Sequence, residues 1–342
     1  MAGNNERLLL IQLKRIGDFI LTAPAVAALR AAKPEAEIVA VVPAAVAGLA
    51  GCCAGLTRVL PYRSHRPNLH TWASIAAGAW DACADFAGTD RTAFMTRLSR
   101  ARQRVGYEKF ADTASKRMAY NHLSDAPVRE LHTVDFHLAL LEELGVSHAC
   151  EPRQPCFQVP ARVSKWTGVR LAEQGVHGPY AVIHPGTARA EKLWEPDRWA
   201  EVAACLVNEE KLPVVITGAN DSIEREHLAA LRRRLTVPVA DLCGSLSLVQ
   251  TAAVIAGAEM VLGVDSMAMH LAAMFERPQV VLFGPTNPFH WRPRHEAAVV
   301  VAAGGTGPLT AFEPKAAGAE MNLISTAEII NAMRALRRPP AP

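Results

Sequence analysis

The sequence has no C-x-x-C pair, and its seven cysteines are scattered over 342 residues. A disulfide framework or a structural zinc site would need paired cysteines at short, regular spacings. Most of these cysteines instead stand inside apolar runs, which is typical of buried free thiols. The cysteine pattern therefore argues against a disulfide scaffold and predicts a protein of a reducing compartment.

The sequence also has no long hydrophobic run near its start. Residues 1–7 are polar, and the mostly apolar stretch that follows, residues 8–13, spans only six positions. The hydrophobic region of a signal peptide needs about 7–15 residues, and a membrane-spanning helix needs about 20. We therefore expect a cytoplasmic protein, for which peripheral contact with a membrane surface stays open.

Two nucleotide-binding motifs are missing as well. The first strand-to-helix turns of the two halves read KRIGD (residues 14–18) and HPGT (residues 184–187), so neither contains G-x-G-x-x-G, and no Walker A sequence is present. A single glycine in such a turn is weak evidence for any nucleotide. These absences disfavour a hydride-transfer enzyme.

What the sequence does contain is an alternation of apolar strands and helical segments. Half of the residues are hydrophobic and one fifth are charged, and the length exceeds what one core usually serves. The alternation predicts an α/β fold with parallel sheets and helices on both faces. A Pro-rich stretch at residues 151–160 interrupts it. We expect one domain at residues 1–160, a second at 161–324, and a terminal helix and tail at 325–342 that packs on one domain, bridges both or returns to the first.

Positive charge is concentrated in residues 91–117. This segment carries eight basic residues against Glu108 and Asp112, a net charge of +6, which leaves −3 for the rest of the chain. It is read either as a solvated helix face or as a patch for a phosphorylated acceptor or an anionic membrane surface. Nucleic acid is disfavoured as a partner, because no helix-turn-helix or finger pattern accompanies the patch.

The most informative stretch is GVDSMAMH (residues 263–270), together with LFGPT (residues 282–286). The pattern predicts a strand that ends at Asp265, a helix that begins at once, and a second strand that ends in Gly-Pro-Thr. A helix N-terminus at the end of a parallel strand presents unpaired N–H groups and a positive dipole end, and α/β sheets bind phosphate there. We expect an anionic ligand at this position.

Several separated blocks of the sequence resemble glycosyltransferase family 9, the ADP-heptose:lipopolysaccharide heptosyltransferases. They follow the family's order over nearly the whole chain and comprise KRIGDFILTAP (residues 14–24), HPGT (184–187), KLW (192–194), GA (218–219), LCG (242–244), GVDSMAMH (263–270) and FGPT (283–286). Met267 departs from the glycine common at its position. That variant, with WRP at residues 291–293, is most similar to the subgroup that includes the side-branch (third) heptosyltransferases.

The resemblance implies a GT-B architecture, in which two Rossmann-like domains with parallel sheets face each other. It implies an inverting transfer of heptose from ADP-heptose to a phosphorylated, lipid-linked acceptor of the lipopolysaccharide inner core, without a cofactor or a metal ion. The sequence fits this expectation, because it contains no D-x-D metal motif. The helix N-terminus after Asp265 could supply the charge neutralisation that a metal would otherwise provide.

Inversion by a single displacement needs a base on the acceptor hydroxyl and a stabilised diphosphate leaving group. The family's proposed base falls on Asp18, in the turn after the first strand; the structural alternative is that Asp18 only caps its helix. Lys14 and Arg15 flank this turn and could attract acceptor phosphate or balance the charge of Asp18. Three arginines of the basic segment complete the predicted acceptor-binding set, namely Arg97, Arg100 and Arg104.

For the leaving group we expect Lys192 to supply the charge and Thr187 a hydroxyl. One charge-assisted contact contributes about 1.5–3 kcal/mol, and the alternative for Lys192 is a solvated loop lysine. A carboxylate beside a diphosphate is repelled, so Asp265 is expected to accept hydrogen bonds from sugar hydroxyls, to cap its helix, or both.

The helix after Asp265 contributes the remaining contacts. The N–H groups of Ser266, Met267 and Ala268 are expected to hold phosphate. His270, about one turn further, is read either as a donor to phosphate or sugar or as a buried structural histidine. Trp194 and Trp199 are expected to be packing aromatics.

Nucleotide identity is expected to depend on the sheet edge. By similarity to the family, backbone groups at Leu246 would meet adenine, and the carboxylate of Glu224 would meet the ribose hydroxyls. Asp221 is a rival for the latter role, because the loop GANDS (residues 218–222) aligns in two ways.

Two other functions stay open at this point. The same donor chemistry could act on a protein or a small metabolite, or the chain could be a noncatalytic nucleotide-sugar-binding relative.

Overall fold

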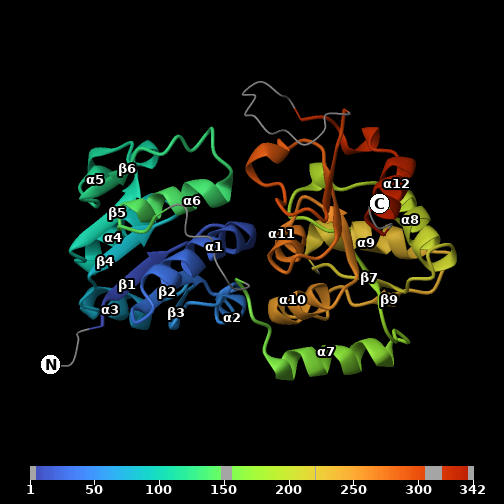
Figure 1. Cartoon of the computed structure of the whole chain (residues 1–342), viewed down its shortest axis with the longest axis horizontal. Helices are drawn as coiled ribbons and strands as arrows, with labels where there is room; N and C mark the ends of the chain where they lie inside the picture. The colour runs from blue at the N-terminus through green and yellow to red at the C-terminus, as the bar shows by residue number, and fades with distance from the viewer. Residues whose placement is uncertain (1–4, 148–155, 220, 305–317, 338–342) are drawn as a thin grey trace. The chain divides into compact units, whose positions relative to one another are not determined.

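The computed structural model describes residues 5–147, 156–219, 221–304 and 318–337. The chain divides into two compact units, Met1–Gln158 and Val159–Pro342, each with a six-stranded parallel sheet (Figure 1). The predicted α/β class with two parallel sheets is therefore confirmed. Residues 151–155 of the predicted boundary stretch and residues 338–342 of the predicted tail lie outside the described residues.

The first unit has the strand order β3-β2-β1-β4-β5-β6, with every pair parallel. Its strands are β1 Arg7–Ile11, β2 Glu37–Pro43, β3 Arg58–Tyr62, β4 Ala82–Asp85, β5 Gln103–Tyr107 and β6 His122–Ser124. Its helices are α1 Ile16–Ala32, α2 Ala47–Ala50, α3 Leu69–Ala77, α4 Asp90–Ser99, α5 Ala114–Arg117 and α6 Thr133–Glu142, with the 3₁₀ turn η1 at Glu108–Phe110.

Side-chain alternation explains how this sheet is covered. Leu9 and Ile11 point to the same face of β1, because successive side chains of a strand point to opposite faces. On that face they share a core with Ile75 of α3 and Met95 of α4. The helices α3 and α4 therefore lie side by side on one face of the first sheet.

The second unit has the strand order β12-β11-β10-β7-β8-β9, again all parallel. Its strands are β7 Ala181–His184, β8 Val214–Ile216, β9 Ala240–Asp241, β10 Met260–Val264, β11 Gln279–Phe283 and β12 Ala298–Ala302. Its helices are α7 Ala161–Glu173, α8 Pro196–Asn208, α9 Ser222–Arg234, α10 Leu248–Ala256, α11 Met267–Met274 and α12 Thr326–Arg337, with 3₁₀ turns η2 Ala190–Lys192, η3 Pro288–His290 and η4 Met321–Leu323.

The terminal helix α12 packs within the second unit. It lies against α8, β11 and β12, and its Ile329 and Met333 are fully buried. Arg334 of this helix pairs with Glu209 and Glu210, which follow α8. The helix predicted for the tail thus completes the core of the second unit.

Parallel pairing places all strand-to-helix turns of a unit at one edge of its sheet, the carboxyl edge. In the first unit this edge carries the turn from β1 to α1 and the first turn of α1, which contains Asp18. In the second unit it carries the turns after β7, β8, β10 and β11. Among the described residues, no helix combines the length and apolar character needed to cross a bilayer.

Candidate functional site

Three strands at the centre of the second sheet end at the same level. Gly263 of β10 lies opposite His184 of β7, and Val264 lies opposite Leu282 of β11. The segments that follow these strands therefore start side by side at the carboxyl edge. They contain three of the sequence blocks singled out above, HPGT (184–187), DSMAMH (265–270) and FGPT (283–286).

One carboxylate oxygen joins these segments. The Nζ atom of Lys192 donates to Oδ2 of Asp265 at 2.5 Å, and the hydroxyl of Thr286 donates to the same oxygen at 2.9 Å. Both charged side chains are largely buried, with 12% and 7% of their surfaces exposed. Lys192 is therefore not a solvated loop lysine, which was the alternative to a binding role. A buried charge needs such a partner, because desolvation of an unpaired ion is costly.

Helix α11 begins immediately after Asp265 without a side-chain cap. Its N-cap residue is Ser266, which makes no side-chain hydrogen bond to the first turn, and the Ser266 hydroxyl is buried without a partner among the described residues. The alternative in which Asp265 caps helix α11 is thus wrong, because Ser266 is the N-cap. Its carboxylate is held by Lys192 and Thr286 instead. The first-turn N–H groups and a buried hydroxyl are the donors that an anion would use.

Trp194 fixes the segment that carries Lys192. The indole is completely buried, stacks edge-on against Trp199 at 4.8 Å between ring centres, and donates from Nε1 to the carbonyl of Ile324 at 3.0 Å. The expectation that Trp194 and Trp199 are packing aromatics is confirmed. In the block KLW the tryptophan anchors η2 to the core, so that the lysine two residues earlier reaches Asp265.

Glu224 links the turns after β7 and β8. It is 5% exposed, and its Oε2 accepts a hydrogen bond from the backbone N–H of Ala219 at 2.5 Å. Burial raises the pKa of this carboxyl group. The carboxylate lies directly over Gly186, where an added Cβ would stand 2.3 Å from Oε2. Only glycine allows that approach.

Asp221 has a different role from Glu224. Its Oδ1 accepts hydrogen bonds from the N–H groups of Ile223 and Glu224, both at 3.0 Å, so it is the N-cap of α9. The structure thus gives Asp221 and Glu224 different contacts, although the loop at residues 218–222 aligns with the family in two ways. Asn220, between Ala219 and Asp221, lies outside the described residues.

The other predicted donor-binding residues fall at the same carboxyl edge. Thr187 is buried in the turn after β7, Met267 is half-buried at the start of α11, and His270 is buried one turn later. Leu246 is half-buried in the loop between β9 and α10. These positions follow from strand polarity, because each residue lies in the loop or helix that follows the carboxyl end of a strand.

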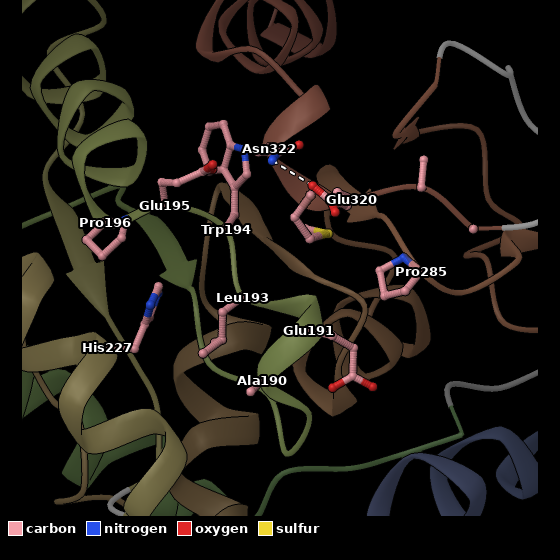
Figure 2. A pocket seen from close by; sticks show the side chains of 13 residues that line it. Ala190, Glu191, Leu193, Trp194, Glu195, Pro196, His227, Pro285, Glu320 and Asn322 are labelled. Atoms are coloured by element: carbon pink, nitrogen blue, oxygen red, sulfur yellow. Dashed lines mark hydrogen bonds between the residues drawn. The ribbon is translucent and has the colours of Figure 1, made fainter.

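A pocket of about 560 Å³ lies beside η2 in the second unit (Figure 2). It is lined by Glu191, Trp194, Glu195, His227 and Pro285, among others, and by none of the predicted donor-binding side chains. The Nε2 atom of His227 is buried without a hydrogen-bond partner in the described part of the chain. This pocket is distinct from the Lys192–Asp265 junction.

In the first unit Asp18 occupies the third position of α1. Arg15 is the N-cap, and its backbone N–H donates to Oδ2 of Asp18 at 3.1 Å. The side chain thus supports the start of the helix from inside it, and does not form the N-cap that the structural alternative assumed. Within the described residues no hydrogen bond reaches its second oxygen, Oδ1, and Asp18 is half-buried. One carboxylate oxygen is fixed and the other is available.

Lys14 stands in the same turn over an aromatic cluster. Its Nζ lies 4.8 Å from the ring centre of Phe110, and no carboxylate pairs with it among the described residues. Phe110 packs edge-on against Tyr107 at 5.5 Å, and the Tyr107 hydroxyl lies 2.9 Å from Nδ1 of His137. Burial and the nearby Lys14 charge lower the pKa of His137 well below its ordinary value. The cluster therefore holds Lys14 by a cation–π contact and adds no negative charge.

Gly88 makes room for Phe110. Its φ of +62° is in the left-handed region, and an added Cβ would lie 2.6 Å from the Phe110 side chain. Gly145 is also left-handed, at φ +73°, but has nothing within 4 Å of the position that a Cβ would take. The two glycines differ in steric surroundings and share the same backbone requirement.

The structure does not bring Arg97, Arg100 or Arg104 together with Asp18. Arg97 and Arg100 lie at the carboxyl end of α4, and Arg104 lies at the amino end of β5. This is the amino edge of the sheet, opposite to the edge that carries Asp18. The Arg104 guanidinium donates to the carbonyls of Ala101 and Ala119, both at 2.9 Å, which is a structural role. Arg15, by contrast, is exposed beside Asp18.

Other cations of the basic segment do lie at the carboxyl edge. Arg91 is in the first turn of α4, and Lys109 follows β5 in η1. A count of charges along the chain could not separate the two groups. The order of each residue relative to its strand could have done so, because residues after a strand and residues before it lie at opposite edges.

His184, the last residue of β7, is buried. Its Nδ1 lies 2.9 Å from the Thr217 hydroxyl, and burial lowers its pKa to about 4. The ring is therefore neutral at pH 7. Among the described residues no group of three or more His, Cys, Asp or Glu side chains has the arrangement of a metal site.

Comparison with known proteins gives one consistent result. The sequence pattern of glycosyltransferase family 9 (heptosyltransferase) matches residues 69–317. A lipopolysaccharide heptosyltransferase 3 from Escherichia coli is 24% identical over 303 residues, which cover 81% of this chain and 83% of that protein.

Solved structures show the same fold. A glycosyl transferase family 9 structure from Veillonella parvula has a TM-score of 0.84 at 20% identity and covers 98% of both chains. An E. coli heptosyltransferase solved with ADP-2-deoxy-2-fluoro heptose has a TM-score of 0.72 at 22% identity and covers 96% of this chain and 99% of that one.

Replacement of Gly88 by alanine tests the packing under Lys14. Both Gly88→Ala and Gly145→Ala force alanine into the left-handed region, at a cost of about 1 kcal/mol. Only Gly88→Ala also displaces Phe110, which we expect to lower the free energy of unfolding by about 1–3 kcal/mol more. Urea unfolding of the two variants measures the difference. Equal destabilisation would contradict the steric role of Gly88.

The pKa of His184 gives a pH dependence of stability. The unfolded chain protonates this histidine near pH 6.5 and the folded chain only near pH 4, so folded-state stability falls as the pH drops from 7 toward 4. The expected loss at pH 5 is about 2 kcal/mol. His184→Gln can keep a bond to Thr217 but does not titrate. The unfolding free energies of wild type and variant, measured at pH 7 and pH 5, should diverge by this amount; parallel pH profiles would rule it out.

Proposed function

The chain belongs to glycosyltransferase family 9, the heptosyltransferases, and from this premise we propose that it transfers heptose from ADP-heptose to a phosphorylated sugar of the lipopolysaccharide inner core. The transfer inverts the anomeric centre by a single displacement and uses no metal ion. The observation that carries the proposal is the junction of Lys192, Thr286 and Asp265 at the uncapped start of α11.

This junction supplies what a diphosphate leaving group needs. The first-turn N–H groups of α11 and the buried Ser266 hydroxyl face an anion as preorganised donors, and Lys192 adds a full positive charge. Such donors stabilise charge that develops on the leaving oxygen as the C–O bond breaks. When the diphosphate binds, Lys192 turns toward it, and Asp265 accepts hydrogen bonds from heptose hydroxyls.

Glu224 is the proposed partner of the ribose. Asp221 is already occupied as the cap of α9, whereas the Glu224 carboxylate lies between the turns after β7 and β8, where a nucleotide would meet the carboxyl edge. Backbone groups at Leu246, in the next turn of the sheet, are the proposed contact for adenine.

Asp18 is the proposed base, and Lys14 and Arg15 are the proposed acceptor contacts. The free oxygen of Asp18 takes the proton of the acceptor hydroxyl as the new C–O bond forms. Lys14 has no carboxylate partner in the described residues and is held over Phe110, so its charge is available to an acceptor phosphate. The similarity to a heptosyltransferase 3 supports a side-branch acceptor, and we place the enzyme at the cytoplasmic side of the inner membrane.

Lys192 can be tested through ADP binding. We expect Lys192→Met to weaken ADP by about 10- to 100-fold, because a charge-assisted contact of about 1.5–3 kcal/mol is lost, and to leave adenosine binding nearly unchanged. Isothermal titration calorimetry measures both. Lys165→Met, which removes an exposed lysine of α7, is the matched control.

Loss of Lys192 also leaves the Asp265 carboxylate buried and unpaired. The double variant Lys192→Met, Asp265→Asn removes that charge, so it should recover most of the lost stability without recovering ADP affinity. If Lys192→Met binds ADP as tightly as the wild type, the assigned role of the lysine is wrong.

Asp18→Asn tests the base. Asparagine can still accept the hydrogen bond from the Arg15 N–H, so helix α1 should start at the same residue. We expect ADP affinity to be unchanged and kcat to fall by about 10²- to 10⁴-fold. The measurement is mass spectrometry of a lipopolysaccharide core acceptor after incubation with ADP-heptose. Asp90→Asn removes an exposed acidic residue at the start of α4 and is the control; full activity of Asp18→Asn would exclude Asp18 as the base.

A further inference from the structure

Large apolar side chains are exposed together on α3 and α4. Leu69 is 79% exposed and Phe94 is 60% exposed, and the half-buried ring of Trp72 contacts Phe94 edge-on at 5.8 Å between ring centres. Leu69 and Trp72 are one helical turn apart on α3, so the three side chains are contiguous. In a soluble protein, clustered exposure of this kind marks an interaction surface.

Arginines surround these apolar side chains. On α4, Arg91 and Arg97 lie one turn before and one turn after Phe94, and Arg63 and Arg66 precede Leu69. All four are exposed, and within the described residues no carboxylate pairs with any of them. We call this set the α3–α4 surface; it comprises Leu69, Trp72, Phe94, Arg63, Arg66, Arg91 and Arg97.

Negative charge is nearly absent from this part of the chain. Residues 38–80, which include β3 and α3, contain no Asp or Glu. The one acidic residue of α4 is Asp90, and it lies 3.5 Å from Nζ of Lys116. The surface is thus an apolar centre with a rim of unneutralised cations, the arrangement of segments that lie in the headgroup region of anionic membranes.

We propose that the α3–α4 surface binds an anionic phospholipid bilayer, with Leu69, Trp72 and Phe94 entering the interface and the arginines contacting lipid phosphates. Two exposed apolar side chains and one half-buried ring are too few for a stable interface between two copies of the chain. A nucleic acid would leave the apolar centre without a partner. The positive rim matches the anionic headgroups, and the apolar centre matches the acyl boundary beneath them.

The position of the surface fits a lipid-linked acceptor. Helices α3 and α4 begin after the carboxyl ends of β3 and β4, at the same edge of the first sheet as Asp18. An acceptor anchored in the bilayer would be presented to that edge. This last step rests on the proposed function, whereas the membrane contact itself does not.

Vesicle sedimentation tests the proposal with the full-length chain. Vesicles of phosphatidylcholine alone are compared with vesicles that contain about one third phosphatidylglycerol. We expect binding to the anionic vesicles only, weakened by salt. Leu69→Ser, Phe94→Ser should weaken it by about tenfold or more, and Arg66→Gln, Arg91→Gln should weaken it by a similar factor.

The control variant is Val169→Ser, Leu323→Ser. It removes two apolar side chains of the second unit that are 54% and 61% exposed, and it should bind vesicles like the wild type. Wild-type affinity of the Leu69, Phe94 variant, or equal loss in the control variant, would overturn the proposal. So would a wild-type dimer in sedimentation velocity that the Leu69, Phe94 variant abolishes, since the surface would then be an interface between copies.

Failure of the membrane proposal and failure of the proposed function give different results. The Leu69, Phe94 variant should keep wild-type ADP affinity and a wild-type kcat on a short, water-soluble core oligosaccharide. If vesicle binding behaves as expected but wild-type protein transfers no heptose to any acceptor, the membrane-binding proposal is supported and the proposed function is wrong. If transfer is intact and vesicles do not bind, only the surface assignment falls.

Discussion

The buried ion pair between Lys192 and Asp265 is the interaction on which the carboxyl edge of the second unit depends. Neither charge could be kept at this depth alone, because an unpaired buried ion costs several kcal/mol (about 3–5 when one partner is removed). The pair, with the Thr286 hydroxyl, connects η2, the end of β10 and the segment after β11 at one oxygen. It also explains why a carboxylate stands beside the proposed anion site. In the proposed mechanism Asp265 orients the lysine before the donor arrives and turns to the sugar afterwards.

Strand polarity decides which charged residues can act together. In the first unit the carboxyl edge carries Lys14 and Asp18 after β1 and Lys109 after β5, while Arg97, Arg100 and Arg104 lie at the other edge. The basic segment is contiguous in sequence and divided in space, because β5 runs across the sheet in the middle of it. Its net charge of +6 is therefore not concentrated on one surface. Part of it stabilises the amino edge through backbone carbonyls, as Arg104 does, and part surrounds Phe94 on α4.

Local sequence patterns predicted the strands, the helices and the places where they begin and end. They did not predict the side-chain contacts that depend on tertiary packing. The alternation of apolar runs predicted both parallel sheets, and the pattern after Asp265 predicted that helix α11 begins there. The packing role of Trp194 was predicted as well, but not that the buried indole would position Lys192. By contrast, nothing in the chain order indicated that Glu224 would lie over Gly186, or that Phe110 would carry Lys14. Those contacts join residues from different turns, and only the register of the strands brings them together.

Asp18 shows how one carboxylate can serve both structure and chemistry. A base that is free to rotate must be oriented in each catalytic cycle, and the entropic cost of this orientation raises the barrier of the reaction. The Arg15 N–H fixes one oxygen at 3.1 Å, and the rigid start of α1 fixes the rest of the side chain. The second oxygen then points in one direction without a partner among the described residues. The hydrogen bond that supports the helix is therefore also the contact that would aim the proposed base, so a helix-start role and a catalytic role for Asp18 are complementary readings of one geometry.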